Sequence, residues 1–174
     1  LLEMIFDVVR SKETFEGIFK NSVLAVLPKA NITAKLSENE TTDTAFKEGI
    51  RFLRTSLQFM PADLNIKKIL VTSAEANSGK TTVTTYLAMA VAEAGKSVVV
   101  IDGDLRKPMI SSSLLSSTPL IGVSTFLSDH NQNINDILLS GPINGLSVVP
   151  SGPTPPNPSD LLNTPRFNLL LEQR

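Results

Sequence analysis

The chain has 174 residues, which is enough for one domain with a sizeable core, and 41% of them are hydrophobic, as in ordinary globular proteins. A net charge of −1 provides no basic field for nucleic acid, so we expect no nucleic-acid partner. The chain has no cysteine and one histidine, which argues against a disulfide framework and a structural zinc site, and no apolar run reaches the roughly 18 residues of a transmembrane helix.

The first part of the chain predicts short elements followed by a linker. Residues 1–10 have apolar residues at helical spacing, residues 11–19 predict a second helix, and residues 22–28 predict a short strand. Residues 31–44 are polar and rich in Thr, Asn and Glu, so we expect a linker there.

A helix is predicted directly after this linker. At about 100° per residue, one narrow arc of it forms an apolar core face made of Phe46, Ile50, Leu53 and Leu57. Glu48 and Arg51 then point away from this face, and Arg54 lies on its flank. The ordinary interpretation of such charges is a solvated helix face, and we do not expect them to serve the interior of their own protomer.

The most informative segment starts with an apolar run at residues 68–73, which predicts a strand, and leads through residues 74–79 into a helix that begins near Lys80. This order is typical of a P-loop, in which backbone N–H groups and the positive end of the helix hold a phosphate. The regular motif has glycine at the position of Ala74, and we expect Asn77 to replace a loop glycine because asparagine tolerates positive φ. An ordinary strand–helix turn is the competing interpretation.

Each residue of the loop has an expected role. Lys80 would reach the β- and γ-phosphates, and the Thr81 hydroxyl would bind Mg²⁺. The helix after the loop has an apolar stripe of Val83, Leu87, Ala90, Val91 and Ala94, and Gly95 ends it. Tyr86, the only tyrosine, is expected to be a packing residue of this helix rather than a phosphorylation site. The predicted nucleotide contacts are Asn77, Ser78, Gly79, Lys80, Thr81 and Thr82 of this loop, together with Arg106 of the motif that follows.

A second motif follows at residues 97–108. Residues 97–101 form a continuous apolar run, as in a strand buried in a parallel sheet, and Asp102 and Asp104 come directly after it. Because ligands bind at the carboxyl ends of such strands, both carboxylates would face the phosphates, and together with Thr81 they are the expected Mg²⁺ ligands. Asp102 is the expected base or orienting group for an incoming hydroxyl, and Lys80, Asp102 and Asp104 form the expected catalytic set. A solvated turn is the alternative for the Asp-Gly-Asp sequence, and Arg106 is ambiguous between phosphate contact and structural pairing.

The last part of the chain predicts a strand at residues 145–152, a proline-rich loop, and a helix at residues 166–174. The loop leads to a helix start at Asn157 or Ser159, and His130 is expected in a surface loop. These elements predict an α/β fold of the P-loop NTPase type, with a mostly parallel sheet and flanking helices.

In these motifs the chain resembles the bacterial tyrosine kinases (BY-kinases), cytoplasmic kinases tied to capsule and exopolysaccharide export. The resemblance extends from about Leu36 to the last residue. It rests on residues 77–82 as a Walker A motif, the Asp102, Asp104 and Arg106 spacing as a Walker A′ motif, the Glu48, Arg51 and Arg54 helix, and residues 145–162.

The resemblance implies an ATP- and Mg²⁺-dependent protein-tyrosine kinase that phosphorylates itself and regulates polysaccharide polymerisation and export. It also implies a homo-oligomeric ring joined through Glu48, Arg51 and Arg54, which presents tyrosines in trans. Family members continue into a further strand that ends in an aspartate and into a tyrosine-rich tail. Neither is present in these residues, so we expect a sheet that is incomplete at the C-terminus and a fragment of low or no activity.

The resemblance further implies how the chain is organised. Residues 1–35 would be a juxtamembrane segment that follows a membrane-bound chain-length-regulator region, in the same chain or as a partner. Residues 36–174 would be the N-terminal part of the kinase domain, at the cytoplasmic face of the bacterial inner membrane.

Two alternative functions belong to other classes. A partitioning or septum-positioning ATPase shares this kind of sheet, but its loop carries a signature lysine where this chain has Glu75. A non-catalytic nucleotide-binding regulator of polysaccharide chain length is disfavoured by the intact Lys80, Asp102 and Asp104.

Overall fold

The computed structural model describes residues 11–20, 22–29, 44–61, 66–115, 117 and 119–172. The predicted helix at residues 1–10 and nearly all of the predicted linker lie outside them. The elements in chain order are α1 (Lys12–Phe19), α2 (Thr44–Gln58), α3 (Lys80–Glu93), β1 (Val98–Ile101), α4 (Ile110–Leu114), α5 (Val123–Ser128), α6 (Ile134–Ile137), β2 (Leu139–Ser140), β3 (Leu146–Val149), α7 (Pro158–Leu162) and α8 (Pro165–Glu172).

A small mixed sheet lies at the centre of the fold, with the strand order β1-β3-β2. β1 pairs with β3 in parallel, from Val98 opposite Leu146 to Ile101 opposite Val149. β2 is antiparallel to β3. The strands predicted at residues 97–101 and 145–152 are therefore confirmed, as Val98–Ile101 and Leu146–Val149, and they lie side by side although they are far apart in the sequence.

The apolar run at residues 68–73 does not form the predicted strand, since residues 66–73 have no regular secondary structure. Ile69 and Leu70 are 52% and 88% exposed. A strand is defined by its hydrogen-bonded neighbour, and within the described residues this run has none, because the sheet consists of β1, β3 and β2 alone. Residues 22–28 form no strand for the same reason.

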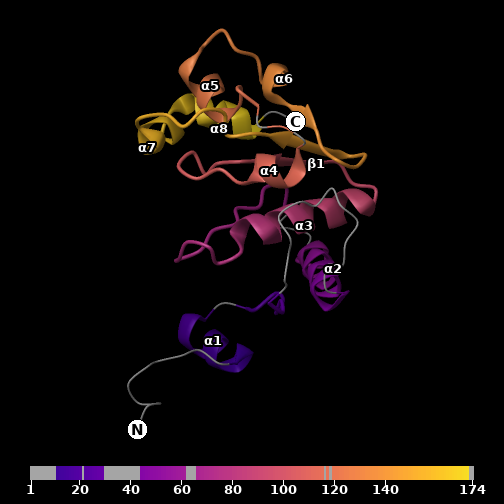
Figure 1. Ribbon diagram of the computed structural model, residues 1–174. Helices are drawn as coiled ribbons and strands as arrows, with labels where there is room; N and C mark the ends of the chain where they lie inside the picture. Colours follow the sequence, from indigo (N-terminus) through magenta and orange to yellow (C-terminus); the bar gives the residue numbers. More distant parts are fainter. Residues whose placement is uncertain are drawn as a thin grey trace.

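Helices cover both faces of the sheet (Figure 1). On one face α3 and α4 pack against β1 and β3 through a cluster that includes Ala88, Val100, Ile110 and Val148. On the other face α5, α6 and α8 bury Val123, Phe126, Ile137 and Leu170 around Val149. Within the described residues no helix combines the length and the apolar character needed to cross a membrane.

α3 lies between the sheet and α2 (Figure 1). It is therefore buried on two sides, and its buried residues are not limited to the single predicted stripe: Thr85, Tyr86, Leu87, Ala88, Ala90 and Ala92. Of the predicted stripe, Ala94 is exposed. Tyr86 is 8% exposed and meets the Phe46 ring edge-on at 5.3 Å between centroids, so the packing role predicted for it is confirmed.

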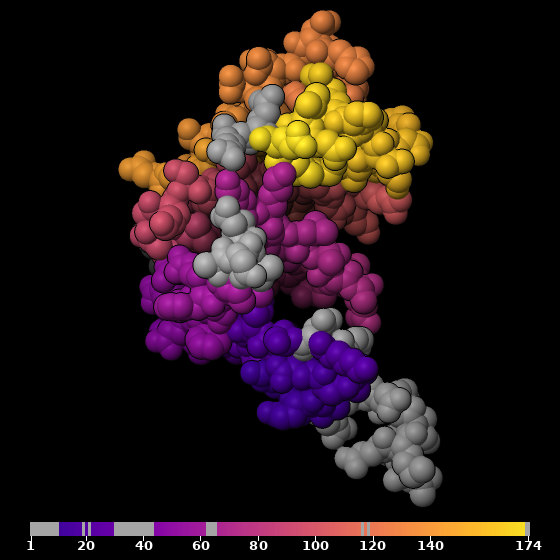
Figure 2. All heavy atoms as spheres, turned by 180° about the vertical axis from the view of Figure 1, so that it is seen from behind, coloured from indigo at the N-terminus to yellow at the C-terminus, as the bar shows by residue number. Residues whose placement is uncertain are grey.

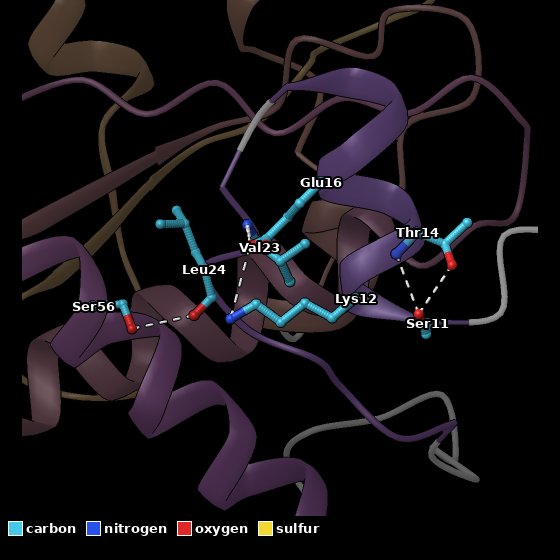
Figure 3. Close-up of polar contacts among 7 residues, drawn as sticks. All are labelled: Ser11, Lys12, Thr14, Glu16, Val23, Leu24 and Ser56. Carbon is cyan, nitrogen blue, oxygen red and sulfur yellow. Dashed lines mark hydrogen bonds and ion pairs between the residues drawn. The ribbon is translucent and has the colours of Figure 1, made fainter.

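The N-terminal segment at residues 22–29 lies against α2 (Figures 2 and 3). Leu27 packs on the cluster formed by α2 and α3, and Gly49 makes room for it, since a Cβ at this position would be 2.8 Å from Leu27 Cδ2. The Ser56 hydroxyl donates to the Leu24 carbonyl at 3.2 Å. Glu16 of α1 accepts the Val23 N–H at 2.9 Å and forms an ion pair with Lys12. The segment is thus held to the domain by both packing and hydrogen bonds.

Candidate functional site

The predicted phosphate-binding loop leads directly into α3. Gly79 precedes the helix with φ of +92°, and Asn77 has φ of +59°. Asn77 is one of two non-glycine residues with positive φ in the described part of the chain, which confirms the backbone conformation predicted for it. Among the residues that the structure describes, no side chain caps the start of α3, so its first N–H groups remain available to an anion.

Lys80 is held inside this loop. Its Nζ donates to Ser73 Oγ at 2.8 Å and to the Glu75 carbonyl at 3.2 Å. The hydroxyls of Ser73 and Ser78 donate to the same carbonyl at 2.7 and 3.0 Å. The roles of Ser73 and of the Glu75 carbonyl were not predicted, because a serine at the end of an apolar run carries no pattern that reveals its partner.

Thr81 and Thr82 are half-buried in the first turn of α3. Their carbonyls accept the Thr85 hydroxyl at 2.9 and 3.0 Å, which fixes this turn. The Thr81 hydroxyl has no hydrogen bond to the described residues, so it is available as a metal ligand.

The second motif forms a tight turn after β1, and Asp102 is at its centre. Asp102 is 3% exposed, and its two oxygens accept N–H groups from Asp104 and from Ile110 at 3.2 and 3.1 Å. Burial raises the pKa of the Asp102 carboxyl, the negative charge of Asp104 adds to this, and the backbone hydrogen bonds oppose it. Asp102 therefore connects the end of β1 to the start of α4.

Asp104 has a different environment because it is exposed to solvent. One of its oxygens accepts the N–H groups of Arg106 and Lys107 at 3.2 and 3.0 Å, and its other oxygen accepts none from the described residues. Arg106 Nη2 donates to Ser159 Oγ at 3.2 Å, which ties this turn to α7. Of the two roles considered for Arg106, the structural one is the contact observed.

The topology brings the two motifs to one end of the α3–β1 unit. A short connection at residues 94–97 joins the end of α3 to the start of β1, and the two elements pack together. The start of α3 at Lys80 and the turn at Asp102 therefore lie toward the same end of the unit. Within the described residues no hydrogen bond or ion pair joins Lys80 or Thr81 to either aspartate.

The predicted metal ligands differ in how well they suit Mg²⁺. The described residues contain no group of three or more His, Cys, Asp or Glu side chains that could hold a metal. A Mg²⁺ ion bound with ATP needs fewer protein ligands, because waters and phosphates complete its octahedron. Thr81 and the open oxygen of Asp104 fit this role, whereas both oxygens of Asp102 already accept backbone N–H groups.

The three predicted oligomerisation residues do not behave alike. Glu48 and Arg51 are exposed on α2, as expected. Arg54 is half-buried and donates from Nη1 to the Ala90 carbonyl of α3 at 2.9 Å, so it does serve its own protomer, contrary to our expectation. A long side chain on the flank of a core face can reach the neighbouring helix, and the position of a residue around its helix does not show this.

The remaining expectations are met at the surface. His130 is exposed between α5 and α6. Asn157 is the N-cap of α7, with Pro158 at the first helical position.

Comparisons with known proteins identify the class of protein that this fold and site define. Residues 69–140 match the CobQ/CobB/MinD/ParA nucleotide binding domain family. The tyrosine kinase domain of BceF superposes with a TM-score of 0.81 at 27% identity, covering 94% of this chain and 71% of that one. The protein therefore has the P-loop nucleotide-binding fold, as predicted, with only a small sheet in the described residues.

Curated relatives of the chain indicate which kind of P-loop protein it resembles. The tyrosine-protein kinase CpsD of Streptococcus agalactiae is 33% identical over 81% of this chain and 58% of its own length. The kinase Etk of Escherichia coli K12 is 34% identical over 79% of this chain and 18% of its own. The homologues of this chain are therefore bacterial tyrosine kinases, and the chain spans little more than half the length of the S. agalactiae relative.

Proposed function

We propose that the protein transfers the γ-phosphoryl group of ATP to tyrosine hydroxyls of proteins, including tyrosines of other copies of the same protein. The observation that carries this proposal is the position of the loop at Lys80 and the turn at Asp102 at one end of the α3–β1 unit. Similarity to tyrosine-protein kinases and to a nucleotide-binding domain family supports ATP as the phosphoryl donor.

Some residues at this end of the unit would neutralise the charge of the phosphates, and Asp102 would accept the proton of the tyrosine hydroxyl or orient that hydroxyl. Phosphoryl transfer depends mainly on positioning and electrostatics, so Lys80 and the uncapped N–H groups of α3 would stabilise the phosphate oxygens. Mg²⁺, when bound, would neutralise the β- and γ-oxygens, and Thr81 and Asp104 are the residues that would hold it. Asp102 is the acceptor for the hydroxyl proton or orients that hydroxyl, and its raised pKa makes the carboxylate a better proton acceptor.

We further propose that the protein works as a homo-oligomer attached to the bacterial inner membrane, where it regulates capsular or exopolysaccharide polymerisation and export. Glu48 and Arg51, which are exposed on α2, are the residues proposed to contact a neighbouring subunit. Each subunit would then present its tyrosines to the active site of that neighbour. Residues 1–35 would connect the kinase to a membrane-bound chain-length regulator. Recovery of the natural protein in the soluble fraction after membranes are pelleted would contradict the attachment.

The kinase proposal is tested by expressing the gene to its natural stop codon and measuring ATP-dependent phosphotyrosine by mass spectrometry. Lys80→Met should lower turnover by orders of magnitude and leave the fold intact, because the lysine acts on charge at the phosphates. Lys96→Met is the matched control, since Lys96 is exposed at the opposite end of the α3–β1 unit and should keep activity.

The alternatives predict other results. ATP hydrolysis without phosphotyrosine would identify a switch ATPase of the partitioning type. Neither hydrolysis nor phosphotyrosine in the natural protein would favour a non-catalytic regulator that only binds nucleotide.

A further inference from the structure

Three side-chain donors converge on one backbone carbonyl in the phosphate-binding loop. The Glu75 carbonyl accepts hydrogen bonds from Ser73 Oγ, Ser78 Oγ and Lys80 Nζ, at 2.7, 3.0 and 3.2 Å. Ser73 Oγ also accepts from Lys80 Nζ at 2.8 Å. Ser73, Glu75 and Lys80 therefore form a closed triangle in which every side is a hydrogen bond.

This triangle and a bound phosphate would compete for the same group. A P-loop offers N–H groups and an ammonium to the phosphate, whereas here a carbonyl oxygen lies against the ammonium. A carbonyl carries partial negative charge and repels phosphate oxygens, and two of the three N–H donors of Lys80 are directed at Ser73 and Glu75. Contact of Lys80 with both the β- and the γ-phosphate therefore requires the release of at least one of these bonds.

We propose that Ser73 is a positioning residue that holds Lys80 in a closed, nucleotide-free form of the loop. Opening releases Lys80 toward the phosphates, so the closed form sets the apparent affinity for nucleotide. The inference rests on the proposed nucleotide-binding function, and it adds a residue that precedes the motif used to recognise that function. Within the described part of the chain, Ser73 is the one residue that accepts a bond from Lys80 through its side chain, so the closed form can be weakened selectively at this position.

The expected effect of Ser73→Ala on nucleotide affinity depends on the fraction of molecules whose phosphate-binding loop is open. An apparent dissociation constant equals the intrinsic constant divided by the fraction of binding-competent molecules. Loss of a solvent-exposed hydrogen bond to a charged group is expected to shift such an equilibrium about three- to tenfold. Ser73→Ala should therefore tighten ADP binding by about this factor and lower the KM for ATP without raising kcat.

Two measurements on the protein expressed to its natural ends test this proposal. Calorimetric titration with ADP gives the affinity, and the rate at which an amine-reactive acetyl ester labels Lys80 without nucleotide, read by mass spectrometry, reports the closed loop directly. Ser73→Ala should label Lys80 several times faster than the wild type. Ser73→Thr retains the hydroxyl and should restore wild-type values, and Thr72→Ala, which removes the neighbouring hydroxyl, should change neither.

The outcomes separate this proposal from the proposed function. Unchanged Lys80 labelling in Ser73→Ala would overturn the closed loop, and so would weaker ADP binding, because Ser73 would then support the bound state. If the wild type binds no ADP, the proposed function fails, while faster labelling in Ser73→Ala would still support the closed loop.

Discussion

Asp102 is the only buried carboxylate in the described part of the chain. Its oxygens accept N–H groups on both sides of the turn, from Asp104 and from the first residue of α4. The same burial that fixes this turn disfavours the charged form and raises the pKa of the carboxyl. The residue proposed as the base or orienting group thus also contributes to the pH dependence of stability.

The pKa of Asp102 predicts the sign of that dependence. The folded state binds the proton more tightly than the unfolded state. The contribution of Asp102 to stability is therefore fully present below the unfolded pKa, which is about 3.9 for an aspartate. It is lost as the pH rises through the raised pKa of the folded state. The free energy of unfolding of the wild type minus that of Asp102→Asn should therefore decrease over this window, as measured by urea denaturation at a series of pH values.

The matched control is Asp129→Asn, which alters an exposed carboxyl outside this turn. A difference between wild type and Asp102→Asn that stays constant with pH would contradict the prediction.

Residue type predicted some parts of the site and could not predict others. Asn77 adopts positive φ because its short polar side chain tolerates that region, a property readable from the residue itself. The aspartates were found from their place after an apolar run. The contacts of Lys80 with Ser73 and of Arg54 with Ala90 depend on which rotamer a long side chain adopts, and no spacing in the sequence encodes that.

At the scale of elements, two apolar runs of similar composition have different outcomes. Residues 98–101 form β1 because β3 provides a parallel neighbour, whereas residues 68–73 have no neighbour within the described residues and form no strand. Hydrophobic pattern predicts that a run can be buried in a sheet, but pairing depends on distant segments. For this reason local helices such as α2 and α8 were predicted more reliably than the strands.

Two arginines of α2 have different expected roles, Arg54 within its own protomer and Arg51 between subunits, and substitutions can distinguish them. Arg54→Ala should lower the free energy of unfolding by about 1–2 kcal/mol, because the Ala90 carbonyl loses a charged donor in a half-buried site. Arg51→Ala removes an exposed side chain and should stay within about 0.5 kcal/mol. Urea denaturation gives both values.

Sedimentation of the natural protein then tests the proposed subunit contact separately. Arg51→Ala should reduce the oligomeric mass, and an unchanged mass would remove Arg51 from that contact. Equal losses of stability in the two variants would contradict the assignment of Arg54 to its own protomer.

For the whole molecule, exposed apolar side chains gather in the segment before the phosphate-binding loop. Ile66, Ile69 and Leu70 are 40%, 52% and 88% exposed within five residues. Contiguous apolar surface of this kind binds hydrophobic dyes and promotes association. We therefore expect the 174-residue chain to enhance the fluorescence of anilinonaphthalene sulfonate while folded, and Leu70→Lys to reduce this signal.

Val26→Lys is the matched control for that dye experiment. Val26 is 72% exposed but belongs to the N-terminal segment and not to the run at residues 66–70, so its replacement should change the signal less. A folded chain with no dye signal would contradict the prediction.

The parallel pairing of β1 with β3 has a consequence for the order of events during synthesis. Val98 cannot meet Leu146 until all the residues between them have left the ribosome, and at about 5–20 residues per second this takes on the order of seconds. During that interval β1 and the run at residues 68–73 are both apolar and unpaired on the nascent chain. The interval is long enough for a chaperone to bind either of them before the sheet exists.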